Sequence, residues 1–395
     1  MKRNFTYSEM NTARNRISQT ALSRRSFLQT AAVTGVSVVI PASAGSLEIP
    51  AARAQANRQA TSGDGQGGAL PNPIIPNFQG EYDSSPMPSF QVAKRPMGST
   101  GLQVSILGMG GFHLGAALSQ DVVNGMVAKA LDHGINLFDN AWEYQQGAGE
   151  ERLGVALKGK RDRAILVTGV CTYGREKDIA MRMLEDSLTH LQTDYIDVWQ
   201  VHDVIYYNDP ELIYQTDGVL EALTAARQQG KVRFVGFTGH KNPSIHLDML
   251  DRGFHFDTVQ MPINPFDPSF RSFERNVLPV AVQKGMAVFS IKGMSGSGES
   301  IVRGALTPTE ALSYSMSVPG VSATVSGMES MEVLDQNLEI LSNFKPLTED
   351  QMAALREHGR QFIDGRYELY KTTVKYESDL GRALHGYPSS MELPA

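Results

Sequence analysis

The chain has 395 residues, a formal net charge of −6 and 41% hydrophobic residues, which are values of an ordinary globular protein. This mild acidity, without any cluster of basic residues, gives no reason to expect nucleic-acid binding. The single cysteine, Cys171, excludes a disulfide framework, a cysteine zinc site and an iron–sulfur cluster within the chain.

The N-terminal segment carries the features of an export signal. Two arginines stand in Ser23–Gln29 (SRRSFLQ), a mildly apolar run follows from Thr30 to Ile40, and small residues suited to cleavage recur up to Ala56. This combination resembles a twin-arginine (Tat) signal, although a disordered basic tail is the alternative. We therefore predict a signal region over residues 1–56, the Tat export machinery as a partner and a periplasmic or exported protein. The apolar run is too short for a membrane span, and none is expected in the mature form.

Residues 57–92 are rich in Gly, Pro, Asn, Gln and Ser, which is typical of an irregular linker. A regular pattern then covers residues 93–345, and a C-terminal helical extension is expected over 346–395. Thr348 begins the extension's helical pattern, with Glu349 and Asp350 in the first turn. We expect helix to continue later, for example over residues 366–370.

Short apolar runs alternate with amphipathic ones along the central region. Near-continuous apolar runs are typical of strands that are covered on both faces. The predicted strands are 104–109, 135–139, 164–168, 195–201, 232–237, 257–261, 286–291 and 321–325. The predicted helices are 120–133, 149–158, 176–191, 215–229, 244–252, 272–284, 308–317 and 330–342.

Glycines at positions where a left-handed helix end is favoured support these boundaries: Gly134, Gly230, Gly253 and Gly285 each precede a strand. Eight strands, each followed by a helix, predict a single-domain (β/α)8 TIM barrel of the α/β class. A doubly wound open sheet is the alternative. It would normally carry a glycine-rich phosphate loop with a third glycine, which Gly108–Gly111 (GMGG) lacks.

Active sites of such barrels lie at the carboxyl ends of the strands. Asp139 ends the second predicted strand with Tyr144 in the loop after it, and His202 ends the fourth. A tyrosine near a histidine can donate a proton to a carbonyl oxygen that gains charge. The hydride of a carbonyl reduction must then come from a cofactor, because no side chain supplies one.

Five segments resemble the aldo/keto reductase family, in order along the chain and together covering about residues 93–345. The two most specific are Asn136–Leu157 (NLFDNAWEYQQGAGEERLGVAL) and Thr189–His202 (THLQTDYIDVWQVH), and the others are 94–111, 231–240 and 325–337. The resemblance implies that Asp139 is an orienting acid, Tyr144 the proton donor and His202 the residue that positions the carbonyl. With its export signal, the sequence looks like a bacterial, secreted branch of the family.

The resemblance also implies a nicotinamide cofactor, NAD(H) or NADP(H), lying extended across the barrel mouth. Thr238 and Gln260 would hold the carboxamide, and Trp142 or Tyr173 would shape the substrate pocket. Lys292 is a phosphate partner or an exposed loop charge, with neither favoured. The residues expected at the adenosine half are Ser326, Gly327, Gln336 and Asn337, with phosphates near the start of the last helix.

The sequence departs from the family at the third strand, where Gly169 occupies the position of the tetrad lysine. The lysine's charge would lower the pKa of the tyrosine and pair with the aspartate. Without it we predict a raised pKa for Asp139 and weaker proton transfer from Tyr144. Arg175 or Lys177 could fold back into the gap, although helix geometry disfavours this.

A second departure concerns the choice of cofactor. Glu329 and Val333 stand where members that prefer the phosphorylated cofactor often carry basic residues. A carboxylate would repel a 2′-phosphate but could accept hydrogen bonds from a free ribose hydroxyl, which favours the unphosphorylated form.

Two functions remain open at this stage. The first is reduction of an aldehyde or ketone carbonyl, a sugar included. The second is a catalytically degenerate nucleotide-binding or sensor protein on the same barrel, which Gly169 favours. A metal-dependent hydrolase is disfavoured, since no His-x-His stands at the first strand and no cluster has metal-ligand spacing, so no metal is expected.

Overall fold

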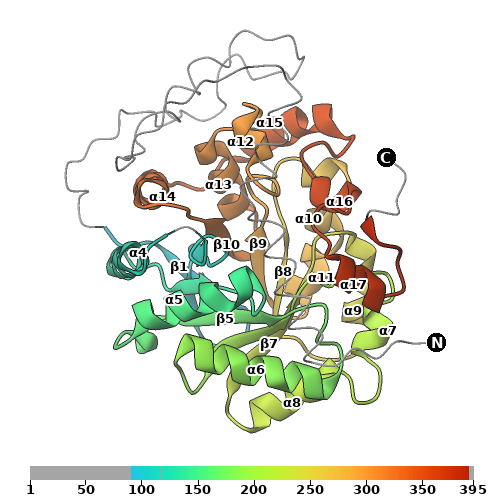
Figure 1. Ribbon diagram of the computed structural model, residues 1–395. Coiled ribbons are helices and arrows are strands. Elements are labelled where there is room, and N and C mark those ends of the chain that lie inside the picture. Colours follow the sequence, from blue (N-terminus) through green and yellow to red (C-terminus); the bar gives the residue numbers. More distant parts are fainter. Residues whose placement is uncertain (1–89, 117, 391–395) are drawn as a thin grey trace, which may run out of the picture.

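The computed structural model describes residues 90–116 and 118–390 (Figure 1). The predicted twin-arginine signal, nearly all of the predicted linker and residues 391–395 lie outside the described residues. Among the described helices, none combines the length and the apolar character needed to cross a membrane.

Eight parallel strands close into a barrel in the order β10-β3-β4-β5-β6-β7-β8-β9. The predicted (β/α)8 barrel is confirmed, and the open doubly wound sheet is wrong. The strands are β3 (Leu107–Gly110), β4 (Leu137–Asp139), β5 (Ile165–Val170), β6 (Ile196–Val201), β7 (Val232–Thr238), β8 (Thr258–Pro262), β9 (Ala287–Ile291) and β10 (Val321–Gly327).

The first predicted strand, 104–109, is wrong as a single element. Residues Gln103–Ser105 form β2, which pairs antiparallel with β1 (Lys94–Pro96) in a separate hairpin, and only β3 joins the barrel. The apolar pattern runs through both strands because Val104 and Leu107 are both fully buried, one below the barrel and the other in its wall. Hydrophobic periodicity alone therefore could not separate them.

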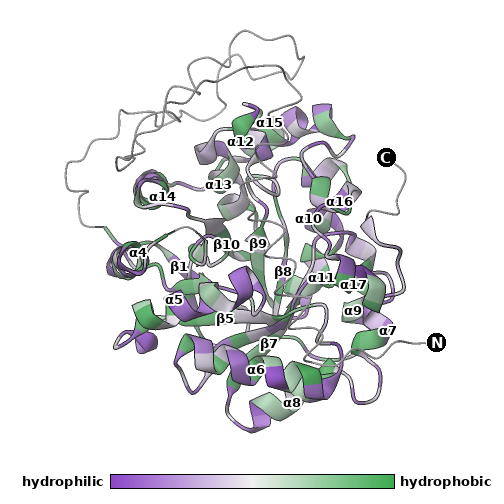
Figure 2. Cartoon of the chain, viewed as in Figure 1, coloured by the Kyte–Doolittle hydropathy of each residue, from purple (hydrophilic) through white to green (hydrophobic). Residues whose placement is uncertain are grey.

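Helices surround the barrel and connect successive strands (Figure 1). They are α4 (Gln120–Asp132), α5 (Ala148–Leu157), α6 (Lys177–Leu191), α7 (Asp209–Ile213), α8 (Val219–Gln228), α9 (Pro243–Asp251), α10 (Phe273–Asn276), α11 (Leu278–Gln283), α12 (Glu299–Val302), α13 (Pro308–Ser317) and α14 (Met331–Asn343). Short 3-10 turns are η2 (Tyr144–Gly147), η3 (Arg161–Arg163) and η4 (Asp267–Ser269). Figure 2 shows hydrophilic and hydrophobic residues side by side on these helices, as expected for helices that cover a core with one face.

The predicted helix over 272–284 is wrong as one helix, because α10 ends at Asn276 and α11 begins at Leu278. Pro279 stands in the first turn of α11, where its missing N–H is tolerated, whereas inside a continuous helix it would remove a hydrogen bond. The four glycines expected at helix ends all have positive φ angles, between 73° and 88°.

The N-terminal hairpin packs beneath the barrel. Met97 and Val104 are fully buried and share a hydrophobic cluster with inward-facing strand residues such as Val167, Val198 and Phe289. The hairpin therefore closes the amino-terminal end of the barrel, opposite to the end where active sites lie.

We expect Gly98→Ala to lower the free energy of unfolding by about 2 kcal/mol, through overpacking. Gly98 has a φ of 54°, and an added Cβ would lie 2.5 Å from Ala287 N and 2.6 Å from Gly285 O. Gly101→Ala is the matched control, since Gly101 also has positive φ but nothing within 4 Å of an added Cβ. Equal losses of unfolding free energy for the two variants in urea would contradict close packing between the N-terminal hairpin and the barrel.

The C-terminal segment folds back onto the barrel through α15 (Glu349–Gly359), η5 (Arg360–Phe362), α16 (Leu369–Thr372) and α17 (Asp379–Leu384). The expected capped start at Thr348 is confirmed, with Thr348 and Gln351 forming a capping box. The expected helix over 366–370 is wrong in its first half. Gly365 adopts a φ of 75° and the chain turns there, so α16 begins only at Leu369.

Candidate active site

The strand ends bring Asp139, Tyr144 and His202 together at the barrel mouth. Asp139 is the last residue of β4, and His202 follows β6 directly. The Tyr144 ring stands edge-on to the His202 imidazole, with 5.7 Å between ring centroids. They also interact electrostatically: the charge of His202 lowers the pKa of Asp139, and the charge of Asp139 raises the pKa of Tyr144. The three residues that the sequence singled out therefore share one site.

An unusual turn holds Tyr144 in place. Gln145 and Gln146 have φ angles of 46° and 62°, and Gly147 follows at 93° before α5 begins. Non-glycine residues adopt this left-handed region rarely, and such strain persists where the surrounding structure enforces it. The turn places the tyrosine over the mouth, where its ring also meets Phe112 edge-on at 5.3 Å.

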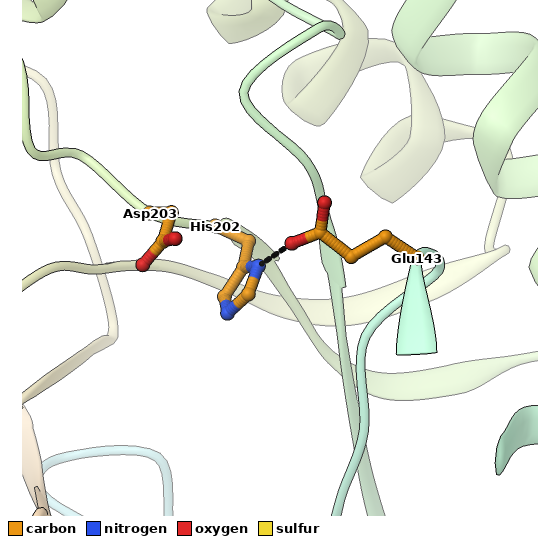
Figure 3. A group of neighbouring side chains, drawn as sticks. All are labelled: Glu143, His202 and Asp203. Carbon is orange, nitrogen blue, oxygen red and sulfur yellow. Dashed lines mark hydrogen bonds and ion pairs between the residues drawn. The ribbon is translucent and has the colours of Figure 1, made fainter. Parts of the chain in front are cut away.

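Glu143, His202 and Asp203 form a group of neighbouring side chains (Figure 3). Nδ1 of His202 lies 3.0 Å from Oε1 of Glu143, and Asp203 Oδ1 lies 3.1 Å from Nε2 of His240. Atoms of metal-ligating type in the group lie within 4.8 Å of one another. Since Glu143 engages His202 and Asp203 engages His240, we interpret the group as two acid–histidine pairs rather than as metal ligands.

Arg175 anchors the backbone after β6. Its guanidinium donates to the carbonyl oxygens of His202 and Asp203 at 3.1–3.2 Å, and its Nε donates to Oδ1 of Asp209 at 2.7 Å. Arg175 thus reaches the end of β6, but none of its hydrogen bonds goes to Asp139. Lys177 pairs with Glu221 in the outer helix layer at 3.0 Å. Neither residue bonds to the carboxylate that the tetrad lysine would meet.

The electrostatics of the mouth follow from burial and from its carboxylates. Burial raises the pKa of Asp139 to about 6, against a hydrogen bond from Gln260 and the charge of His202. Burial, together with Asp139, Asp203 and Glu143, raises the pKa of Tyr144 well above its ordinary value. Burial alone would raise the pKa of Asp203, but His240 and His202 lower it overall. The raised pKa of Asp139 has the direction expected where a cationic partner is missing.

We expect Asp139→Asn to stabilise the protein at pH 8 and to have little effect at pH 4. Folding raises this pKa from 3.8 to about 6, so the associated stability is fully present below about pH 4 and is lost as the pH rises through about 6. This rise corresponds to about 3 kcal/mol. Thermal unfolding across this pH range measures the difference, and Asp251→Asn on the exposed end of α9 is the control. A gain in stability of Asp139→Asn that is the same at every pH would contradict the raised pKa of Asp139.

The residues expected at the carboxamide lie at the mouth but make contacts within the protein. Gln260 Nε2 donates to Asp139 Oδ2 at 3.1 Å across the barrel, and Thr238 Oγ1 accepts from Asp203 N at 3.0 Å.

Lys292 follows β9, and its ammonium lies 5.0 Å from the centroid of the Tyr376 ring. Burial lowers the pKa of Lys292, although Asp203 opposes this. Lys292 is therefore not the exposed loop charge of the alternative reading.

The residues expected at the adenosine half gather where β10 leads to α14. Asn337 Nδ2 donates to Ser326 Oγ at 3.2 Å, whereas Asn337 Oδ1 is buried without a hydrogen-bond partner among the described residues. A side chain at Gly327 would meet the His113 ring, since an added Cβ would lie 2.6 Å from it. Gln336 lies on the exposed face of α14.

Trp142 does not shape the pocket, and that expectation is wrong. Its side chain is fully buried, and its Nε1 donates to Oδ2 of Asp186 on α6 at 3.1 Å, so it faces the helix layer. Tyr173 is buried, and its hydroxyl donates to Ser378 Oγ at 2.9 Å. Sequence reasoning missed Glu143, whose only signal is its place directly before Tyr144.

The C-terminal segment lies against the mouth. Several contacts tie it to the loops after β5, β6 and β7: Tyr173 to Ser378, His385 to Asp209 at 2.9 Å, His240 to the Tyr370 carbonyl at 3.3 Å and Lys241 to Glu377. Figure 1 shows α16 and α17, in red, on this side of the barrel. The segment therefore forms part of the wall of the site.

Comparison with known proteins agrees with this geometry. The sequence model of the aldo/keto reductase family matches residues 106–298. The chain is 25% identical to the uncharacterized oxidoreductase YqkF of Bacillus subtilis, over 68% of this chain and 97% of that protein. It is 26% identical to L-galactose dehydrogenase of Arabidopsis thaliana, over 66% and 92%. The structure of aldo-keto reductase AKR11C1 from Bacillus halodurans (holo form) aligns with a TM-score of 0.56 and 25% identity, over 69% of this chain and 96% of that one.

The barrel, the family match and these relatives point to one class of protein, an NAD(P)-dependent oxidoreductase built on a (β/α)8 barrel. Within that class, the chain is similar to members of the aldo/keto reductase family.

Proposed function

We propose that this protein reduces the carbonyl group of an aldehyde or ketone, with a sugar as one candidate class, in a reaction that uses NAD(H) or NADP(H). The observation that carries the proposal is the meeting of Tyr144, His202 and Asp139 at the carboxyl ends of the strands. The resemblance to L-galactose dehydrogenase supports a sugar, and the family supports the cofactor.

Each side chain has a distinct task in this proposal. Tyr144 donates the proton of its hydroxyl to the carbonyl oxygen as the carbon gains a hydride, so the carbonyl becomes an alcohol. His202 positions the carbonyl oxygen beside that hydroxyl. Asp139, fixed by the Gln260 amide, orients the tyrosine side of the site. A bound nicotinamide nucleotide supplies the hydride.

The residues at the mouth fit such a nucleotide. The buried Oδ1 of Asn337 lacks a partner among the described residues, and a bound ligand would satisfy it. Ser326 and Asn337 would hold the adenosine half, Gly327 would permit close approach, and Gln336 would meet it from the exposed face of α14. Thr238 and Gln260 would hold the carboxamide, and Lys292 would face a phosphate.

We further propose a preference for the unphosphorylated nucleotide. Glu329 is exposed directly before Ser330, the N-cap of α14, where it would oppose a 2′-phosphate. The dissociation constants of NADH and NADPH, measured by calorimetry on the purified chain, test this. At least tenfold tighter binding of NADPH would overturn the preference.

One observation favours a second function. Gly169 lies inside β5, paired with Gln200 of β6, and offers no cation to the mouth. A degenerate nucleotide-binding or sensor protein would keep the nucleotide site without turnover. The two functions differ in whether a carbonyl compound oxidises the bound reduced nucleotide.

A panel of aldehydes, ketones and aldoses, each with NADH and with NADPH, tests the proposed function. We expect loss of the reduced nucleotide that depends on one class of carbonyl and on the protein. Tight nucleotide binding without turnover on any carbonyl would favour the second function, and neither binding nor turnover would reject both.

Export remains a proposal from the sequence alone. The Tat route carries folded proteins, so we propose that the protein leaves the cytoplasm with its nucleotide bound. Mature protein released from the periplasm without nucleotide would count against this.

A further inference from the structure

Gly169 stands at the position of the tetrad lysine in β5, and the space beside it is filled by His202. An added Cβ at Gly169 would lie 2.7 Å from His202 Cβ and 3.2 Å from His202 Cγ. Real Cβ atoms essentially never approach another heavy atom this closely, so a neighbouring group must shift. A side chain at position 169 would therefore displace His202. Gly169 and the position of His202 therefore depend on each other.

Glu143 orients the imidazole in that space. Its carboxylate oxygen lies 3.0 Å from Nδ1 of His202, and the Glu143 side chain is only a quarter exposed (Figure 3). This contact requires Nδ1 to carry a proton and leaves Nε2 outside the pair. At the other end, Arg175 holds the His202 carbonyl at 3.2 Å. The side chain and the backbone of His202 are thus both held from neighbouring loops.

We propose that Glu143 is a positioning residue that holds His202 as an imidazolium, and that this cation takes the place of the missing lysine beside Asp139 and Tyr144. The inference rests on the proposed function and assigns to this pair the charge that proton transfer from Tyr144 needs.

The charges around the imidazole support its protonated form. Burial alone would lower the pKa of His202, yet Asp203, Glu143 and Asp139 together raise it. Among the described residues, the titratable and charged groups that face it or its carboxylate partners are Asp139 from β4, Glu143 and Tyr144 from the following loop, Tyr173 and Arg175 after β5, Asp203 and Tyr206 after β6, His240 after β7 and Lys292 after β9. The largest charge effects on the pKa of His202 come from the three acids.

The consequence for Tyr144 is electrostatic. When the hydroxyl gives its proton to the carbonyl oxygen, a phenolate forms among Asp139, Asp203 and Glu143, all of which oppose it. An imidazolium edge-on to the ring stabilises that phenolate. Activity should then be lost as the pH rises through the pKa of His202, because the neutral imidazole no longer supplies the charge.

The test compares Glu143→Gln with wild type by NMR titration of His202, whose resonance is assigned with a His202→Asn variant. We expect the pKa of His202 to fall by at least one unit in Glu143→Gln and to be largely retained in Glu143→Asp, which keeps the carboxylate. Glu151→Gln on the exposed face of α5 is the control, with no expected shift. Gly169→Ala should reproduce the fall, since its Cβ displaces the imidazole.

The kinetic arm uses the same variants. We expect kcat/KM at neutral pH to fall about tenfold in Glu143→Gln. The alkaline limb of the pH profile of kcat/KM should move to lower pH, and Glu143→Asp should partly restore both the value and the profile. An unchanged titration of His202 in folded Glu143→Gln overturns the inference whether or not the protein is active. If the pKa of His202 falls in Glu143→Gln but the wild-type protein has no turnover, the charge pair is supported and the proposed function is rejected.

Discussion

Tyr144→Phe is expected to lower kcat/KM for carbonyl reduction by about 10³, in the middle of the range for a lost general acid. The substitution removes only the hydroxyl and keeps the ring, so the edge-on contacts with His202 and Phe112 and the turn at Gln145 should remain. The dissociation constant of the nucleotide should stay within about twofold. Steady-state kinetics and calorimetry on the purified variant measure both quantities.

Tyr207→Phe is the matched control, because Tyr207 is 61% exposed and its hydroxyl accepts a surface hydrogen bond from Asn242. It should retain wild-type kinetics. A Tyr144→Phe enzyme within about threefold of wild type would mean that another group donates the proton, and the role given to Tyr144 would be wrong.

Lys371→Met is expected to lower the free energy of unfolding by about 3 kcal/mol, the cost of breaking a buried ion pair. Lys371 is fully buried, and its ammonium lies 2.7 Å from Asp267 Oδ1 and 2.6 Å from Glu368 Oε1. It also donates to the Phe270 carbonyl at 2.8 Å. Burial raises the pKa of Glu368 to about 7 even with Lys371 present, so Glu368 can take up a proton in the variant. Asp267 then loses its cationic partner and keeps the hydrogen bonds from Ser272, Phe273 and Glu274.

Urea unfolding of Lys371→Met and of Lys375→Met tests this expectation. Lys375 is a neighbouring lysine, half exposed and paired with Glu299 at 3.3 Å, so its loss should cost less than about 1 kcal/mol. Because Lys371 lies in α16, beside the mouth, Lys371→Met should also loosen the C-terminal segment, as shown by faster amide exchange over that segment. Equal stability of the two variants would contradict the structural role of the buried lysine.

The barrel could be predicted because its signals are local. The apolar runs 195–201 and 232–237 each correspond to one strand, β6 and β7, and the glycines before the strands adopt the left-handed conformation that helix ends favour. The meeting of Asp139 and His202 followed from topology, since both end parallel strands of one barrel.

The remaining features depend on contacts between distant segments. Glu143 and His202 are 59 residues apart, and Lys371 meets Asp267 across 104 residues. Neither pair leaves a periodic pattern that a sequence could display. Trp142 was expected at the substrate pocket, but its indole donates a hydrogen bond to Asp186 of α6 in the outer helix layer. A loop residue's direction depends on tertiary packing, which the local sequence does not determine.

A single-turnover experiment tests most directly whether the mouth transfers hydride to a carbonyl. The protein is held in excess over reduced nicotinamide nucleotide that carries deuterium on the transferable position, and a carbonyl substrate from the panel is added. We predict that one equivalent of nucleotide is oxidised and that the deuterium is found on the alcohol carbon. Bound nucleotide that stays reduced with every carbonyl offered would contradict the account.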